Sequence, residues 1–285
     1  KESAGETTKL EGVEAEEKDD SGYHITTVRI LNETGAEALS KPVGKYVTVD
    51  VLPLTRREDD AFRLGAEVLA RQIREMLPLK PKSSVLVAGL GNEGITPDAI
   101  GPLAVRSTIA TRHLIRSMPD SFGNLRSVSA VQTGVLGTTG VESAELVAAI
   151  AQDIRPDAVI AVDALASASL SRLCRTVQIA DTGIIPGSGV GNGRSGLSQK
   201  TLGMPVLAIG VPTVVDAATM AQELCEKSGK NADLSPEVAD GAKNMIVTPK
   251  DIDKTAAEIA KLVGYAVNLA LQPSLSIGDV DMFLN

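Results

Sequence analysis

Aromatic side chains and basic residues are both scarce in this sequence. Its 285 residues include three Tyr, three Phe and no Trp, and 36 acidic residues outnumber 28 basic ones, giving a net charge of −8. A protein that grips nucleic acid needs a basic surface for the phosphates and, for single strands, aromatic rings on which bases stack. We therefore expect no direct nucleic-acid partner, and a surface better suited to a basic protein substrate.

Cysteine and histidine are also rare. Cys174 and Cys225 are too few for a disulfide framework or a zinc site, and we expect reduced thiols. Neither His24 nor His113 follows a glycine-rich strand end, which gives little support to a Ser–His or Cys–His nucleophile. No apolar run approaches the roughly 20 residues of a membrane span, which predicts a soluble, cytoplasmic protein with no membrane partner.

Short apolar runs alternate with amphipathic segments over most of the chain. Alternation of this kind predicts the α/β class, with a mostly parallel sheet covered by helices on both faces. Before that region, 24–32 and 45–52 alternate apolar with polar residues, as N-terminal antiparallel strands would. The later strands are expected at 84–89, 127–131, 158–163, 176–180 and 205–211, and the helices at 59–77, 97–117, 140–152, 165–173, 214–227 and 251–271.

The chain is expected to contain one folded unit. Residues 1–22 are polar and charged without an apolar period, and we expect a flexible N-terminal arm there. Residues 23–285 are then a single α/β domain. Within it, Asn32–Gly35 has turn composition, and the polar segment 229–243 is expected to be a loop.

Two aspartates follow strand-type runs. Val85–Leu90 leads into a glycine-rich turn that ends in Thr96-Pro97, a helix-start signal, so that Asp98 falls in the first turn of the next helix. Asp163 ends the run 158–163. Each residue could serve only as a helix cap. If both face one crevice at the carboxyl ends of the strands, one should hold a proton while the other stays ionised, which equips the pair to activate water.

The turn Gly89–Gly94 also fits the dinucleotide fingerprint G-x-G-x-x-G. The acid that should end the next strand is missing, because 128–131 runs into Gln132-Thr133-Gly134. A nucleotide-binding oxidoreductase that uses this turn remains the alternative, and a non-enzymatic peptide-binding module is a third.

A second aspartate motif and a glycine-rich run follow the strand at 176–180. The triplet Asp181-Thr182-Gly183 occurs in pepsin-like proteases, but those are all-β, so we treat the match as chance and expect Asp181 only to line the crevice. The run 183–196, which contains Gly187 and Ser188, could offer backbone N–H groups to a peptide or an oxyanion. A plain surface connection explains this run equally well.

Several ordered segments together resemble the germination protease (spore protease) family. The likeness extends from about residue 24 to residue 270 and is carried by 89–102, 134–142, 159–166, 178–192, 201–206, 208–216 and 245–250. The longest of these, Gln178–Asn192, includes Asp181-Thr182-Gly183-Ile184-Ile185-Pro186-Gly187-Ser188-Gly189.

The resemblance implies an endopeptidase that degrades small acid-soluble spore proteins during germination and is made as a self-processing, homotetrameric zymogen. It also implies a protease domain over 23–285 and a location in the forespore or spore core. The family's catalytic aspartates fall on Asp98 and Asp163, and Asn92, Gly91 and the run with Gly187 and Ser188 are candidates to stabilise the oxyanion. The fold resembles that of hydrogenase maturation proteases, whose equivalent acids bind metal together with a histidine. Since no histidine here stands at a comparable strand end, we expect neither a metal nor another cofactor.

Overall fold

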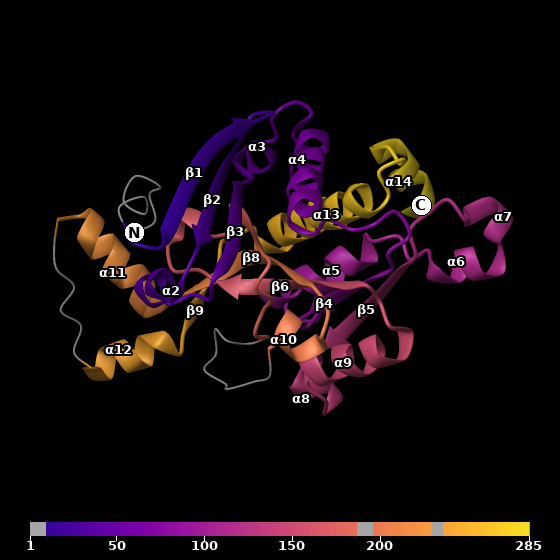
Figure 1. Cartoon of the computed structure of the whole chain (residues 1–285). Coiled ribbons are helices and arrows are strands. Elements are labelled where there is room, and N and C mark those ends of the chain that lie inside the picture. The colour runs from indigo at the N-terminus through magenta and orange to yellow at the C-terminus, as the bar shows by residue number, and fades with distance from the viewer. Residues whose placement is uncertain (1–9, 187–195, 230–235, 285) are drawn as a thin grey trace.

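The structure is a computed structural model that describes residues 10–186, 196–229 and 236–284 (Figure 1). Its strands are β1 (Val13–Asp20), β2 (Tyr23–Ile30), β3 (Gly44–Asp50), β4 (Val85–Leu90), β5 (Val128–Gly134), β6 (Ala158–Ala166), β7 (Thr176–Ala180), β8 (Val206–Asp216) and β9 (Ile246–Val247). Its α-helices are α2 (Glu33–Leu39), α3 (Leu52–Thr55), α4 (Ala61–Met76), α5 (Ile100–Arg106), α6 (Arg112–Ser117), α7 (Pro119–Phe122), α8 (Leu136–Thr139), α9 (Ser143–Ile154), α10 (Gln199–Leu202), α11 (Ala217–Lys227), α12 (Pro236–Lys243), α13 (Ile252–Leu271) and α14 (Ile277–Leu284). Two 3-10 turns, η1 (Thr96–Asp98) and η2 (Leu170–Arg172), complete the elements.

The strands form one sheet in the order β1-β2-β3-β7-β8-β6-β4-β5, and β9 pairs with the end of β8. The core strands β8, β6, β4 and β5 are parallel, whereas β1, β2, β3 and β7 add an antiparallel half. The predicted α/β class, with a parallel core and N-terminal antiparallel strands, is confirmed. Strand β7 runs against both of its neighbours, a reversal that the alternating pattern did not reveal.

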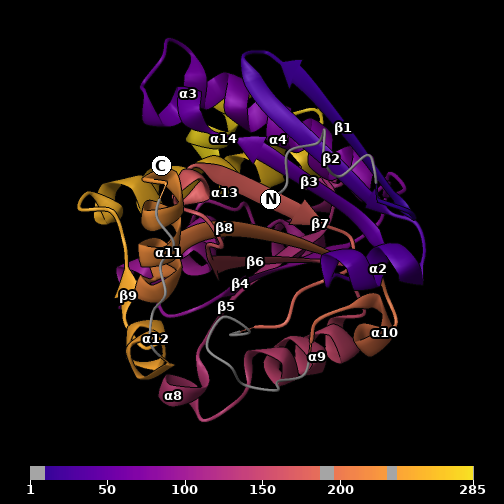
Figure 2. The same cartoon turned by 90° about the vertical axis from the view of Figure 1, so that its left-hand side faces the viewer.

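Helices cover both faces of the sheet, as predicted. Alternate residues of the buried strands face α4, α5 and α13 on one side and α9 on the other, which produces two apolar clusters. Figure 2 shows α4 and α13 on one side of the sheet and α9 and α10 on the other. Burial on both faces explains why these strands read as continuous apolar runs.

Helix α5 lies directly on the backbone of the parallel core because two glycines meet. A Cβ added to Gly89 would lie 2.3 Å from the carbonyl oxygen of Gly101. One added to Gly101 would lie 2.3–2.4 Å from backbone atoms of Leu90 and Val162. This close approach brings the start of α5, and η1 before it, against the ends of β4 and β6.

The prediction of a flexible N-terminal arm at 1–22 is wrong for residues 10–22, the part of this segment that the structure describes. Val13–Asp20 forms edge strand β1, which pairs antiparallel with β2 through a turn in which Ser21 and Gly22 both have positive φ. Two such residues make the favoured hairpin turn. Only Val13 of β1 is buried, and charged residues protect an exposed edge, so the strand shows no apolar period.

Other boundaries differ for local reasons. The expected helix at 165–173 is wrong, because β6 continues to Ala166 and only the short η2 follows. The side chain of Ser169 accepts a hydrogen bond from the N–H of Ser171 there, and this bond competes with helix formation.

The expected helix at 97–117 is divided into η1, α5 and α6. Asn32 caps α2 in place of a turn, and α12 occupies the end of the expected loop 229–243.

Candidate active site

A cavity of about 710 Å³ lies at the carboxyl ends of β4, β6 and β8, the edge at which α/β sheets bind their ligands. We call it the site cavity. The segment Ile185–Pro186, helix α8 and the end of α12 with β9 close its sides. Its polar lining includes Asp98, Asp163, Ser143, Thr213, Asp216, Lys243 and Asn244. The prediction that Asp98 and Asp163 face one crevice is confirmed in this geometry.

Asp98 is positioned by the turn that precedes it. It closes η1, its own N–H donates to the carbonyl of Ile95 at 2.7 Å, and its Oδ2 accepts the N–H of Asn92 at 2.7 Å. The side chain is partly buried. Burial raises the pKa of the Asp98 carboxyl, and the hydrogen bond from Asn92 opposes that rise by favouring the ionised form.

Asp163 is more deeply buried, with 6% of its surface exposed. It belongs to β6 one residue after Val162, which pairs with Gly89 of β4, so the ends of the two strands adjoin. Its Oδ1 accepts the N–H of Ala164 at 2.9 Å. Burial and then the negative charge of Asp98 raise the pKa of Asp163 from 3.8 to about 7.

The two carboxyl groups therefore differ in environment within one cavity. Asp163, in the drier position, holds a proton up to near neutral pH, while Asp98 is more open to water and accepts an N–H bond. Two carboxyl groups whose environments give them different pKa values can act together, one as an acid and the other as a base. The arrangement can activate a water molecule and protonate a second group.

Asn92 and Gly91 hold the turn around Asp98. Asn92 uses its N–H on Asp98, and its side-chain Oδ1 accepts the N–H of Gly94 at 2.9 Å. Gly91 has a φ of +108°, and a Cβ there would lie 2.1 Å from the carbonyl oxygen of Asp98. Gly91 lines the site cavity, whereas Asn92 is not among the lining residues.

The same geometry argues against the nucleotide-binding alternative. In a dinucleotide site the N–H groups of the glycine-rich turn point at a pyrophosphate. Here the carboxylate of Asp98 takes the N–H of Asn92 and brings negative charge to the place where an anion would bind. The turn is built around an acid of the chain itself.

The expectation that Asp181 lines the crevice is wrong. Strand β7 is antiparallel to β8, so its carboxyl end lies at the opposite edge of the sheet from Asp98 and Asp163. There Asp181 is exposed, and its Oδ1 accepts the N–H of Lys45 at 2.8 Å. Gly187 and Ser188 lie outside the described residues. The residues just before them, Ile185 and Pro186, line the site cavity.

Sequence reasoning missed Thr213 and the end of α12. Thr213 of β8 is 1% exposed, and its hydroxyl donates to the carbonyl of Pro97 at 2.6 Å, which ties η1 to the sheet. Its own carbonyl accepts from the hydroxyl of Thr248 at 2.9 Å. Lys243, the last residue of the segment expected to be a loop, and Asn244 after it both line the cavity. A threonine inside an apolar strand gives no sequence signal of such a role.

The histidines lie away from this cavity. His24 is on β2 with its Nδ1 2.9 Å from Asp19, and His113 is on α6. Within residues 10–186, 196–229 and 236–284, no group of three or more His, Cys, Asp or Glu side chains could hold a metal ion. The same residues contain no helix that is both long and apolar enough to cross a membrane.

Comparison with known proteins gives consistent matches. The model of the germination protease family matches residues 1–228. The germination protease of Caldanaerobacter subterraneus is 43% identical over 305 residues, covering 97% of this chain and 93% of the relative. Those of Clostridium perfringens and Bacillus velezensis are 40% and 34% identical, over 97% and 96% of this chain and 93% and 90% of the relatives. Among solved structures, a NiFe hydrogenase maturation protease from Thermococcus kodakarensis aligns with a TM-score of 0.37 and 17% identity, over 70% of this chain and 98% of that one.

Proposed function

This chain belongs to the germination protease family, and from that premise we propose that it is an endopeptidase that degrades small acid-soluble spore proteins during germination. One observation carries the proposal: a buried Asp163 with a pKa of about 7 lies in the same cavity as the more open carboxyl of Asp98. A cavity of about 710 Å³ has room for an extended segment of peptide beside the pair.

In the proposed reaction the two aspartates share one proton. The carboxylate of Asp98 takes a proton from water, and the water oxygen attacks the carbonyl carbon of the scissile peptide bond. Asp163 donates its proton toward the carbonyl oxygen as negative charge develops there. When the C–N bond breaks, the proton taken up by Asp98 passes to the leaving nitrogen. As the C–N bond breaks, one hydroxyl of the tetrahedral intermediate returns a proton to Asp163 and becomes the C=O of the new carboxyl group, so the pair regains its starting state.

Other groups would support the charge on the carbonyl oxygen. Gly91 lines the cavity, and the glycine-rich run that includes Gly187 and Ser188 follows the cavity residues Ile185 and Pro186. Backbone N–H groups from either place are the proposed oxyanion donors. Asn92 acts through Asp98, whose ionised form its N–H stabilises.

We also infer from the family resemblance that the protein is made as a self-processing zymogen and assembles as a homotetramer in the forespore or spore core. Sedimentation of the purified chain tests the oligomer, with four copies expected. Incubation of the freshly expressed protein tests processing. The protein should shorten itself, and the Asp163→Asn variant, which lacks the acid, should stay intact.

The experiment that tests the proposed function compares variants on an unfolded, small, basic spore protein. Asp98→Asn and Asp163→Asn should each reduce kcat/KM by at least about a thousandfold, and the double variant should be no worse, because an acid and a base that act as one unit are not additive. Asp216→Asn is the matched control. Asp216 lines the same cavity but caps α11 by accepting the N–H of Thr219 at 2.8 Å, a task that asparagine also performs. Full activity in either single variant would contradict the proposal.

A further inference from the structure

Strand β1 is the outermost strand on the antiparallel side of the sheet (Figure 2), and among the described residues it pairs with β2 alone. Its eight residues pair with β2 one for one, without a bulge, and they include no proline or glycine. Bulges and prolines are devices that keep a strand edge from pairing with another chain. The edge of β1 therefore retains the regular geometry that an added strand needs.

Alternate residues of β1 turn their backbone groups away from β2. The N–H of Leu31 donates to the carbonyl of Gly12 at 2.8 Å, which makes these two residues a hydrogen-bonded pair. Bonded and non-bonded pairs alternate along an antiparallel ladder. Counted from this pair, Ala15, Glu17 and Asp19 fall in non-bonded pairs, so their N–H and C=O groups point outward. Donors and acceptors thus alternate in one row along the open edge.

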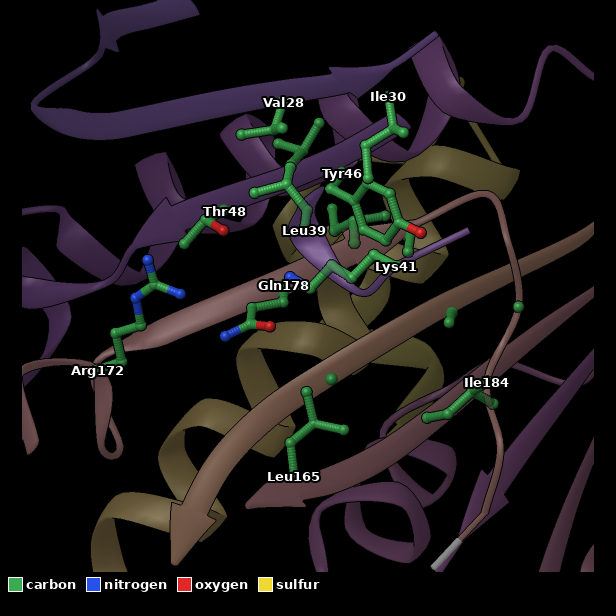
Figure 3. A pocket seen from close by; sticks show the side chains of 16 residues that line it. Val28, Ile30, Leu39, Lys41, Tyr46, Thr48, Leu165, Arg172, Gln178 and Ile184 are labelled. Atoms are coloured by element: carbon green, nitrogen blue, oxygen red, sulfur yellow. The ribbon is translucent and has the colours of Figure 1, made fainter. Parts of the chain in front are cut away.

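The strand is held at both of its ends. At its start, Val13 is buried opposite Ile30, which lines a cavity of about 160 Å³ on that face of the sheet (Figure 3). At the hairpin turn, the guanidinium of Arg71 on α4 donates two hydrogen bonds to the carboxylate of Asp20, at 2.8 and 3.0 Å. A strand fixed in this way loses little freedom when a partner binds, and preorganisation of this kind favours binding.

The charge of the hairpin 13–30 decides which chain can pair with its edge. It contains five acidic residues, all on β1, and the two cations Lys18 and Arg29, so its net charge is −3 with His24 neutral. Successive side chains of a strand alternate between its faces, so acids stand on both faces of this edge. A second copy of β1 would place acids opposite acids, which destabilises strand pairing, whereas Lys or Arg opposite them stabilises it. The edge therefore disfavours its own copy and suits a basic strand.

We propose that the edge of β1 is a docking site for the protein substrate: an extended segment rich in Lys and Arg adds to β1 as a further strand, at a distance from the bond that is cut. This inference rests on the proposed function and deepens it. Main-chain hydrogen bonds to an added strand supply affinity for many sequences. The acidic side chains on both faces of β1 select the basic segments among them.

The docking site and the site cavity bind two different segments of one substrate. Five strand spacings of about 4.8 Å place β1 about 24 Å from β6, which carries Asp163. About eight extended residues or more span this distance. A segment held on β1 raises the local concentration of the bonds beyond it at the site cavity and leaves the chemical step unchanged. A long basic protein therefore gains from docking, and a short peptide that enters only the site cavity does not.

Removing one outward N–H tests the inference. Ala15→Pro deletes an outward donor and keeps the hydrogen bonds between β1 and β2, because an edge strand tolerates proline where its nitrogen faces outward. Ala15→Ser, which keeps the N–H, is the matched control. For an unfolded basic spore protein, the proline variant should raise KM by about tenfold with kcat unchanged, and the serine variant should match the wild type. All three proteins should cleave a short uncharged peptide at the same rate.

Reversing one charge tests the choice of partner. Glu16→Lys changes an exposed acid of β1, and it should raise KM for the basic protein by about threefold and weaken the dependence of KM on salt. Asp153→Lys, on the exposed surface of α9, changes the net charge equally and should leave KM unchanged. Equal effects of the two reversals would show that only the net charge of the molecule acts, and would overturn the docking site.

A binding measurement separates the docking site from the chemistry. A fluorescent peptide of Lys and Thr, eight residues long like β1, should bind the Asp163→Asn protein in fluorescence anisotropy, and adding Ala15→Pro should weaken this binding. Equal KM values for Ala15→Pro and Ala15→Ser, an equal loss on the short uncharged peptide, or a smaller oligomer of Ala15→Pro in sedimentation would each overturn the docking site and leave the proposed function intact. Absence of all cleavage by the wild type would instead refute the proposed function, and the anisotropy would then decide whether the edge binds basic segments.

Discussion

Asp163 carries a proton that the unfolded chain would release. Its pKa is about 7 in the folded chain and near 3.8 without the fold, because burial and the charge of Asp98 both disfavour its ionised form. Between these two values the folded state binds more protons than the unfolded state. Its contribution to stability is therefore full at low pH, falls as the pH rises through this window, and is lost above about pH 7.

Removing the charge of Asp163 should therefore stabilise the protein in alkaline solution. The rise of the Asp163 pKa from 3.8 to about 7 corresponds to about 4 kcal/mol, so Asp163→Asn should raise the free energy of unfolding by up to that amount near about pH 8. The gain should shrink toward about pH 4.5. Denaturant unfolding at both pH values measures it, with Asp153→Asn, on the exposed surface of α9, as the control. An equal effect of Asp163→Asn at both pH values would contradict the assigned pKa.

At the residue scale the sequence was sufficient to predict that Asp98 and Asp163 face one cavity, because each follows an apolar strand. The same rule failed for Asp181. A strand ends at the site edge only if it runs parallel to the core strands, and β7 runs the other way. Strand direction depends on pairing between segments remote in sequence, which no local pattern encodes. The hydrogen bond of Thr213 was not predicted for a related reason, because its acceptor, the carbonyl of Pro97, is 116 residues away.

At the scale of elements, the position of Asp98 depends on how η1 is held. The hydroxyl of Thr213 on β8 donates to the Pro97 carbonyl inside η1 at 2.6 Å. Thr248, between β9 and α13, donates to the carbonyl of Thr213 in turn. The turn that carries one aspartate is thus fastened to the sheet and, through it, to the segment that enters α13.

Loosening this attachment should lower turnover more than it lowers stability. Thr213→Val keeps the shape but loses the hydroxyl, which should cost about 1–3 kcal/mol of stability because the Pro97 carbonyl is left without its donor. A misplaced Asp98 should reduce kcat by about tenfold or more while KM changes little. Thr213→Ser, which keeps the hydroxyl, should restore kcat. Steady-state kinetics and thermal unfolding of the three proteins measure both effects. If Thr213→Val and Thr213→Ser have the same kcat, the hydrogen bond to Pro97 has no part in positioning Asp98.

The elements themselves were only partly predictable. Long buried segments such as α4, α13 and β4 match their expected ranges closely, because their apolar periods extend over many residues. Short helices were not distinguished from one another, as at 97–117, where one helix was expected. There the N–H of Thr111 donates to the carbonyl of Val128, and its hydroxyl donates to the carbonyl of Arg126. Such long-range bonds end a helix without any proline or glycine signal.

At the scale of the whole molecule, the site is assembled from segments spread over most of the sequence. Asp98 comes from the turn after β4, Asp163 from β6, and one wall from the end of α12 and β9. The pattern of strands and helices was sufficient to predict the fold class. The wall contributed by α12 could not be predicted, because the contact of α12 with the cavity depends on tertiary packing. The net charge of −8 agrees with the basic substrate that we propose.

A substrate that must reach a buried carboxyl has to be locally unfolded. Asp163 is 6% exposed, so a peptide bond can meet it only as an extended segment inside the cavity. We expect a basic spore protein to be cleaved rapidly when unstructured, and about tenfold more slowly or worse when duplex DNA holds it folded. Cleavage rates with and without DNA measure this effect. A short peptide that carries the same bond and does not bind DNA is the control, and equal rates for the whole protein would contradict the expectation.

The pH dependence of kcat/KM tests the shared proton of Asp98 and Asp163 most directly, since this quantity reports ionisations of the free enzyme. In the proposed reaction the active form has Asp163 protonated, with a pKa of about 7, and Asp98 ionised. On an uncharged peptide substrate, kcat/KM should therefore fall tenfold per pH unit above about pH 7 and should also decline in acid, where Asp98 gains a proton. A profile that stays level or rises from about pH 6 to about pH 9 would contradict the account.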